Sequence, residues 1–449
     1  MNAKSSLPRY LTAISLLILF LLPVTIQGAP IPTGSPIMAA ENPLSIILMI
    51  GDGMGYEHVE LARLVEVGEA GSLAMQQLTW NASVTTYCAN NPITDSAAAA
   101  TAIATGYKTN RYYVGMNSTG QSVQSILEYA QTLNKSTGVV STSYIEDATP
   151  ASFMAHVIDR SSYSEIARQI VEEANVDVLL GGGLSDFTPT QLSTMESNGY
   201  SLVYNRTAMM NVVSGKIFGI FADHYMDYEL DRNYSVTPSI AEMTNKSLEL
   251  LSQDPDGFFL MVEGGRIDTA AHAADKVRNA LDTIAFDNAI QESIDYVNAH
   301  NNTILIVTAD HETGGLLVVS HNLNTELPAA LSTESEKRTL RAERANNVTV
   351  SWTSTSHTDT PVPLFCYGSY FDALPSGTTI DNTNIYSIMK EYYQSEAPII
   401  EPVATTTPTT TSTSPTTTPT APLDMTLFLI ASVGIVIIVV VVVVINKRR

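Results

Sequence analysis

Short apolar runs that lead into acidic residues constrain the fold of this chain more than any other feature. Three runs are continuous and a fourth is weaker; with the acid after each, they are 45–50 with Asp52, 258–262 with Glu263, 303–307 with Asp310, and 138–141 with Asp147. A continuous apolar run of this length is typical of a strand buried on both faces of a parallel sheet. We therefore expect a buried sheet with carboxylates at its strand ends.

Amphipathic helical stretches separate these runs, for example at about 122–131, 163–174 and 273–298. This alternation predicts an α/β fold, an α/β/α sandwich in which helices flank a central, mostly parallel twisted sheet. Ligands of such sheets bind beyond the carboxyl ends of the strands. The acidic residues named above are all expected at that edge.

A serine stands where an Ala-rich helix is predicted to begin, because Thr94-Asp95-Ser96 precedes the small-residue run 97–102. The first N–H groups of a helix lack internal partners, and the helix dipole is positive there. Such an end can hold a phosphate and favour an ionised hydroxyl. Asp or Ser at a helix start is also an ordinary N-cap, so the functional interpretation depends on which other residues converge on Ser96.

The formal net charge of −22 argues against a nucleic-acid-binding function, because nucleic-acid phosphates would be repelled. An anionic substrate would need a local positive centre, which metal ions would supply. Imidazole with carboxylate suits zinc, and oxygen ligands alone suit magnesium. Asp268 and His272 have the i, i+4 spacing of two ligands on one helical turn, and His311 and His357 are further candidates. The other histidines, at 58, 156, 224, 300 and 321, are interpreted as structural or surface residues.

The ends of the chain predict a secreted and anchored protein. The predicted segments are a signal peptide at 1–29, a Thr/Pro-rich stalk at 401–423, a membrane-spanning helix at 425–445 and a cytoplasmic basic tail at 446–449. Together they predict a single-pass protein of the cell membrane with an extracellular catalytic domain. Cys88 and Cys366 could pair, but neither is in a ligand-spacing motif, and both are interpreted as structural or incidental.

Six motifs, in order along the chain, resemble those of the alkaline phosphatase family. They are IGDGMG at 50–55, TDSAA at 94–98, DATPA at 147–151 with AHV at 155–157 and Arg160, VEGGRID at 262–268 with His272, TADH at 308–311, and SHT at 356–358. The resemblance covers a catalytic domain at 42–395. It implies extracellular hydrolysis of small-molecule phosphate monoesters, and also a homodimer.

The resemblance further implies two zinc ions and one magnesium ion. The ligands implied are Asp268, His272 and His357 for one zinc; Asp52, Asp310 and His311, with Ser96 Oγ, for the second; and Asp52, Thr149 and Glu263 for magnesium, where Asp147 acts through bound water. Relatives often carry lysine, histidine or tryptophan where this chain has Thr269. Threonine brings neither charge nor bulk, so the resemblance supports magnesium less directly than it supports the two zinc ions.

In the reaction that the resemblance implies, Ser96 is the nucleophile and becomes a phosphoserine, and Arg160 binds two phosphate oxygens and is positioned by Asp95. A phosphodiesterase, sulfatase or phosphomutase on the same scaffold is the nearest alternative, although Arg160 favours a terminal phosphoryl group. A non-enzymatic cell-surface protein is the alternative from another class, but it leaves the ligand set without a purpose. Residues 321–350 match no motif and form either an insert near the cleft or, as we favour, a solvated loop.

Overall fold

The structure is a computed structural model, and it describes residues 43–328, 331, 333–373 and 376–395. The predicted signal peptide, stalk, membrane-spanning helix and basic tail lie outside the described residues. The described residues contain all of the candidate site residues named above.

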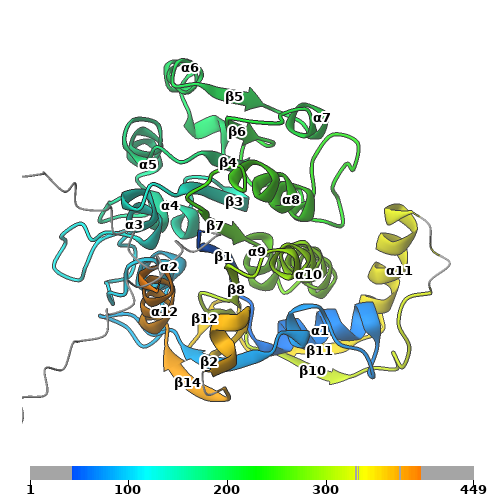
Figure 1. Cartoon of the computed structure of the whole chain (residues 1–449). Helices are drawn as coiled ribbons and strands as arrows, with labels where there is room; N and C mark the ends of the chain where they lie inside the picture. Colours follow the sequence, from blue (N-terminus) through cyan, green and yellow to red (C-terminus); the bar gives the residue numbers. More distant parts are fainter. Residues whose placement is uncertain (1–42, 329–330, 332, 374–375, 396–449) are drawn as a thin grey trace, which may run out of the picture. The chain divides into compact units, whose positions relative to one another are not determined.

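A ten-stranded sheet with the strand order β14-β2-β13-β8-β1-β7-β3-β4-β6-β5 forms the centre of the fold (Figure 1). Its strands are β1 (Ser45–Ile50), β2 (Trp80–Thr85), β3 (Ser136–Tyr144), β4 (Val178–Gly182), β5 (Tyr200–Val203), β6 (Lys216–Ile220), β7 (Phe258–Glu263), β8 (Thr303–Thr308), β13 (Val362–Tyr367) and β14 (Thr378–Asp381). Only β13 runs antiparallel to its neighbours in this sheet, β8 and β2. The predicted mostly parallel sheet is thereby confirmed.

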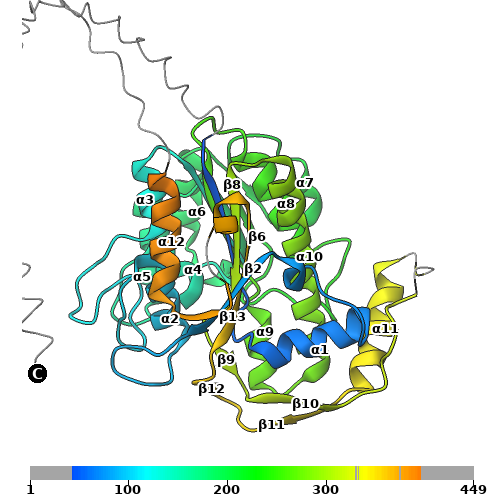
Figure 2. The ribbon, with the colours of Figure 1, turned by 60° about the horizontal axis from the view of Figure 1, so that its bottom comes forward.

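Helices cover both faces of the sheet, which confirms the predicted α/β/α sandwich. Figure 2 views the sheet nearly along its edge, with α2, α3, α4, α5 and α12 on one face and α1, α8, α9, α10 and α11 on the other. The helices are α1 (Tyr56–Val67), α2 (Ser96–Thr105), α3 (Ile126–Thr132), α4 (Ala148–Met154), α5 (Tyr163–Gln169), α6 (Pro189–Ser197), α7 (Arg206–Met210), α8 (Ile240–Leu251), α9 (Arg266–His272), α10 (Lys276–Ala299), α11 (Glu334–Asn346) and α12 (Thr383–Gln394). Two small antiparallel two-stranded sheets, β10 (Leu316–Ser320) with β11 (Thr349–Trp352) and β9 (Glu312–Thr313) with β12 (His357–Thr358), lie outside the main sheet.

Strand register brings the predicted acidic residues to one edge. β1 pairs in parallel with both β7 and β8, and Ile50 at its end lies opposite Glu263 and Thr308. On the far side of β7, Ser141 of β3 lies opposite Glu263. The four strands predicted from apolar runs are therefore adjacent, and the segments that carry the acids leave the sheet at the same end. β1 is buried on both faces, because Ile46 through Ile50 are all 0% exposed.

Segment 321–350 is not the loop that we favoured, because it contains α11 and the start of β11. Its helix is specified by a capping box, in which the Thr333 side chain and Glu336 satisfy each other's backbone N–H groups. Arg341 then forms an ion pair with Glu66 of α1, and Arg344 donates to backbone carbonyls at the end of α1. These contacts come from tertiary packing, so the polar composition of the segment did not reveal them. Cys88 and Cys366 are both buried and free.

The predicted localisation as a single-pass membrane protein is contradicted by the structure. In the part of the chain that the structure describes, no helix combines the length and the apolar character that crossing a membrane requires. The longest described helix, α10, has 24 residues, but charged side chains such as Arg278, Asp282 and Asp287 recur along it. Such charges are costly in hydrocarbon. The segment 425–445, on which the prediction was based, lies outside the described residues.

Candidate metal centre

Ser96 is the first residue of α2, and Asp95 is its N-cap. The Asp95 carboxylate accepts a hydrogen bond from the N–H of Ala98 at 3.2 Å, which satisfies one of the free donors of the first turn. Every residue of α2 is buried, because its run of alanines lets the helix pack closely against α4 and α12. Ser96 is only 4% exposed, and its Oγ lies 3.2 Å from Nε2 of His311. The predicted helix start is therefore present and faces the acidic edge.

Asp52, Asp310 and His311 form one group of potential metal ligands, whose ligand atoms all lie within 4.8 Å of one another. Nε2 of His311 is 3.1 Å from Asp310 Oδ2 and 3.7 Å from Asp52 Oδ1. Asp310 is held in place by hydrogen bonds that its Oδ1 accepts from the N–H groups of Gly53 and His311. This group contains the three residues that the sequence predicted for the second zinc.

Gly53 allows the turn after β1 to pass against α9. Its φ is +70°, and a Cβ added there would lie 2.8 Å from Oδ1 of Asp268. Only glycine fits both the left-handed backbone and the close approach. The glycine therefore sets how near Asp52 stands to the ligands of α9.

Asp268, His272 and His357 also lie close together. Nε2 of His272 is 3.2 Å from Asp268 Oδ2 and 3.2 Å from Nε2 of His357. The other ring nitrogen of each histidine is hydrogen-bonded to a backbone carbonyl. Nδ1 of His272 lies 2.7 Å from Thr355 O, and Nδ1 of His357 lies 3.0 Å from Thr94 O. Since each Nδ1 must then donate, each Nε2 faces Asp268, where it can bind a metal ion or carry a second proton. The hydrogen bond to Asp268 raises the pKa of His272 to about 9, so without a metal ion the His272 ring carries a proton beside this carboxylate. Two imidazoles and a carboxylate this close together fit a metal ion in place of that proton.

The two groups are contiguous because His311 lies between them. The rings of His311 and His357 stack with centroids 3.6 Å apart. The ligand atoms of Asp268, His311 and His357 also lie within 4.8 Å of one another, close enough to bind one ion. Thr313 donates to Asp268 Oδ1 at 2.6 Å and lies 3.2 Å from Nδ1 of His311, so it contacts a member of each group. The sequence analysis missed Thr313, although its place two residues after His311 was a signal.

The predicted third group is built around Glu263 at the end of β7. Ser141 donates a hydrogen bond to Glu263 Oε2, whereas Oε1 has no hydrogen-bond partner among the described residues, and neither has Asp52 Oδ1. Thr149, in the first turn of α4, is also buried. Buried carboxylate oxygens without partners are costly. These oxygens fit a hard cation such as magnesium.

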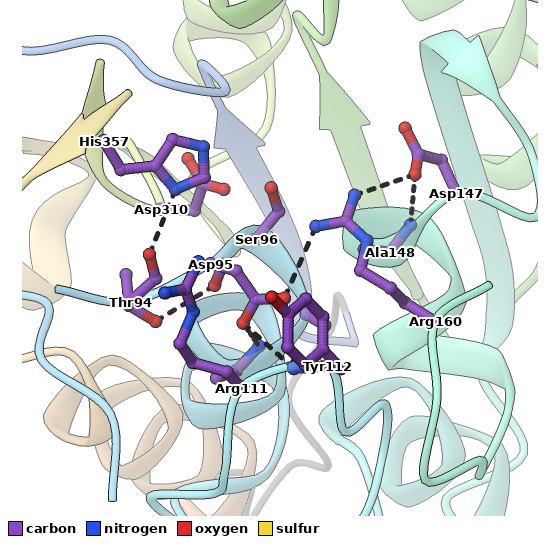
Figure 3. A network of polar contacts seen from close by, with 12 residues as sticks. Thr94, Asp95, Ser96, Arg111, Tyr112, Asp147, Ala148, Arg160, Asp310 and His357 are labelled. Carbon is purple, nitrogen blue, oxygen red and sulfur yellow. Dashed lines mark hydrogen bonds and ion pairs between the residues drawn. The ribbon is translucent and has the colours of Figure 1, made fainter. Parts of the chain in front are cut away.

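Arg160 lies between two carboxylates (Figure 3). Its Nη2 is 3.0 Å from Asp147 Oδ1, and its Nη1 is 3.5 Å from Asp95 Oδ2. Asp147 is fixed in turn by Ser143, which donates to its Oδ2 at 2.6 Å. The sequence analysis paired Arg160 with Asp95 and assigned Asp147 to the metal, but in the structure Asp147 is the nearer partner of Arg160.

The pKa shifts reflect a surplus of buried negative charge. Burial, together with the charges of Asp310 and Asp268, raises the pKa of Asp52 well above its ordinary value. Burial and the charge of Asp147 raise the pKa of Glu263 to about 8. Burial, with the charge of His311, lowers the pKa of His357 to about 3, which leaves that ring neutral. These carboxylates cannot all ionise side by side unless cations balance their charge. A neutral imidazole next to them can bind such a cation.

Comparisons with known proteins give one consistent answer. A sequence model of the family described as alkaline phosphatase matches residues 44–339. Alkaline phosphatase 4 of Bacillus subtilis (strain 168) is 31% identical over 385 residues, which cover 72% of this chain and 83% of that protein. The alkaline phosphatase of Escherichia coli (strain K12) is 31% identical over 430 residues, covering 81% and 90%. The crystal structure of the cold-active alkaline phosphatase from Shewanella sp. aligns with a TM-score of 0.69 and 28% identity, covering 78% of this chain and 100% of that one.

Proposed function

This chain belongs to the alkaline phosphatase family, and on that premise we propose that it hydrolyses phosphate monoesters through a phosphoserine on Ser96. One observation carries the proposal. Ser96 Oγ lies at the N-terminus of α2, 3.2 Å from a histidine nitrogen, in the middle of converging metal-binding groups. Hydrolases that attack with serine need a group that favours the ionised hydroxyl, and this arrangement would provide it.

The metal ligands proposed are those that the family resemblance implies, and two groups of them include ligand atoms within 4.8 Å of one another. Asp268, His272 and His357 would hold one zinc ion; Asp52, Asp310 and His311, with Ser96 Oγ, the second; and Asp52, Thr149 and Glu263 a magnesium ion, where Asp147 would act through bound water. When bound, such ions supply Lewis-acid charge that lowers the pKa of the nucleophile and stabilises the departing alkoxide. The direct bond between Asp147 and Arg160 supports a positioning role for Asp147 beside any role at the magnesium site.

Arg160 and α2 would bind the phosphoryl group. The guanidinium presents two nitrogens in a plane, which suits two phosphate oxygens at once. Although burial opposes its charge, Asp147 and Asp95 raise the pKa of Arg160 above its ordinary value, so it stays a cation. The N–H groups at the start of α2 add partial positive charge on the same side.

The chemistry then follows in two displacements. Ser96 Oγ gives up its proton to water and forms a bond to phosphorus while the bond from phosphorus to the alcohol oxygen breaks, and the departing oxygen takes a proton from water. Water next attacks the phosphoserine, the Ser96 Oγ–phosphorus bond breaks, and Ser96 regains its proton. Inorganic phosphate leaves. We place this activity in a catalytic domain at 42–395 and propose that the domain forms a homodimer, as the family resemblance implies.

The test uses the purified full-length protein with p-nitrophenyl phosphate, bis(p-nitrophenyl) phosphate and p-nitrophenyl sulfate over a range of pH. We expect the monoester to be hydrolysed fastest, with activity that is lost on chelation and restored by zinc. Ser96→Ala should abolish turnover, whereas Ser247→Ala, which removes a similarly buried helical serine of α8, should not. Faster hydrolysis of the diester or the sulfate would favour the corresponding alternative. Full turnover by Ser96→Ala would refute the proposed nucleophile.

A further inference from the structure

Tyr112 has a backbone conformation that its side chain does not favour. Its φ is +73°, in the left-handed region. Among the described residues only three other non-glycine residues have positive φ, and two of them are asparagines, which tolerate this region. A bulky aromatic residue persists there only where its surroundings hold it, and such residues gather at functional sites.

The groups that hold Tyr112 belong to the candidate site. Its N–H donates to Asp95 Oδ2 at 3.1 Å, and its carbonyl accepts from the N–H of Arg160 at 2.8 Å. The same Asp95 carboxylate caps α2 and forms the ion pair with Arg160. The position of Tyr112 is therefore fixed relative to both the nucleophile and the phosphate-binding arginine.

The ring of Tyr112 gains little from burial, because the residue is 52% exposed. Figure 3 shows it beside Asp95 and Arg160, and the guanidinium of Arg111 lies 5.5 Å from its centroid. Ser96 is 4% exposed and Tyr112 is 52% exposed, so a phosphoryl group on Ser96 would be enclosed, and the organic part of a substrate would extend toward the exposed side of the site, where Tyr112 lies. Burial of the ring therefore does not account for the strained backbone of Tyr112 beside the candidate site.

We propose that Tyr112 determines substrate specificity by stacking on the organic part of the monoester, so that nucleoside and aryl phosphates are preferred over alkyl phosphates. The inference rests on the proposed monoesterase function. An aromatic face stacks on any planar ring, and the neighbouring Arg111 strengthens such a platform by its cation–π contact. The substrate class follows from the shape and apolar character of the ring, not from a specific hydrogen bond.

The test compares adenosine 5′-monophosphate with ribose 5-phosphate, which have the same type of leaving alcohol and differ in the planar base. Three variants of the full-length zinc-loaded protein are needed: Tyr112→Gly, Tyr112→Phe and the control Tyr107→Gly. Tyr107 lies on the same loop, is 55% exposed, and makes its backbone bond to Thr105 and not to the site. Glycine accepts positive φ, so Tyr112→Gly should melt no lower than the wild type, and a loss of activity would not reflect unfolding.

We expect Tyr112→Gly to raise KM for adenosine 5′-monophosphate about tenfold, the loss of one base-stacking contact. KM for ribose 5-phosphate and kcat for both substrates should change less than about twofold, within the range expected when no stacking contact is lost. Tyr112→Phe and Tyr107→Gly should behave as the wild type. Equal changes for the two substrates, no change for either, or a Phe variant as poor as the Gly variant would each overturn the inference. A wild type inactive on both substrates would instead refute the proposed function, and the inference with it.

Discussion

Asp95 links the stability of α2 to the binding of phosphate, and two substitutions separate these roles. Its carboxylate accepts from the N–H of Ala98 at 3.2 Å and from the N–H of Tyr112 at 3.1 Å, and it lies 3.5 Å from Arg160 Nη1. Asp95→Ala removes all three contacts. Asp95→Asn removes the charge but keeps an oxygen that can accept from both N–H groups. Both variants remove the same negative charge. The difference between their free energies of unfolding therefore reports the two hydrogen bonds that Asn keeps and Ala loses.

The expected difference can be worked out from those two hydrogen bonds. Loss of an N-cap costs about 1 kcal/mol, and an unpaired, partly buried N–H costs about 1 kcal/mol more. The free energy of unfolding of Asp95→Ala should therefore lie about 2 kcal/mol below that of Asp95→Asn. The measurement is denaturant unfolding of the two zinc-loaded variants, with metal content checked in each.

A second readout concerns Arg160, which loses one of its two carboxylate partners in both variants. The inhibition constant of inorganic phosphate should rise about threefold in each, because the lost pair is partly exposed and 3.5 Å long. Equal stability of the two variants would refute the capping role of Asp95. A phosphate inhibition constant unchanged from the wild type would refute its role in orienting Arg160.

Three further predictions address the site and its surroundings. Arg160→Ala should raise the inhibition constant of inorganic phosphate about 10–100-fold with unchanged zinc content, since it removes a charge-assisted fork; equal inhibition of variant and wild type would contradict this. Thr313→Val keeps the shape but removes the bond to Asp268, and should weaken zinc retention during dialysis about tenfold; undiminished retention would exclude a supporting role. Glu128→Gln should lower the free energy of unfolding by about 0.5 kcal/mol between pH 4.5 and 6.5, because Glu128 and His156 form a partly exposed ion pair in which both side chains are charged in that range. Despite burial, pairing lowers the pKa of Glu128 and raises that of His156, so the contribution is lost as pH falls through the first or rises through the second; a difference that persists unchanged at roughly pH 9 would refute this assignment.

The sequence predicted the centre of the fold because the relevant signals are local. The apolar runs of β1, β7 and β8 are fully buried, and the acids after them meet because parallel strands end at one edge. The start of α2 at Ser96 was likewise encoded in adjacent residues. Periodicity and capping chemistry suffice for features of this kind.

The family resemblance implied that ligands distant in sequence meet, such as Ser96 with His311, but other contacts between distant segments were not predicted. The ion pair of Asp147 with Arg160 requires the turn after β3 to meet the segment after α4, and the bond of Thr313 to Asp268 joins β9 to α9. Similarly, α11 is held by α1 through the pair of Arg341 with Glu66, which composition could not show. The strain at Tyr112 exists only because Asp95 and Arg160 hold its backbone from both sides.

The most direct test of the account is to trap the reaction intermediate. The full-length, zinc-loaded protein is mixed with a phosphate monoester, quenched in acid within milliseconds, digested, and its peptides are mapped by mass spectrometry. The account predicts one phosphorylated residue, Ser96, formed with the wild type and absent from Ser96→Ala. Phosphate on another residue, or a wild type that turns over rapidly without any phosphopeptide at Ser96, would contradict it.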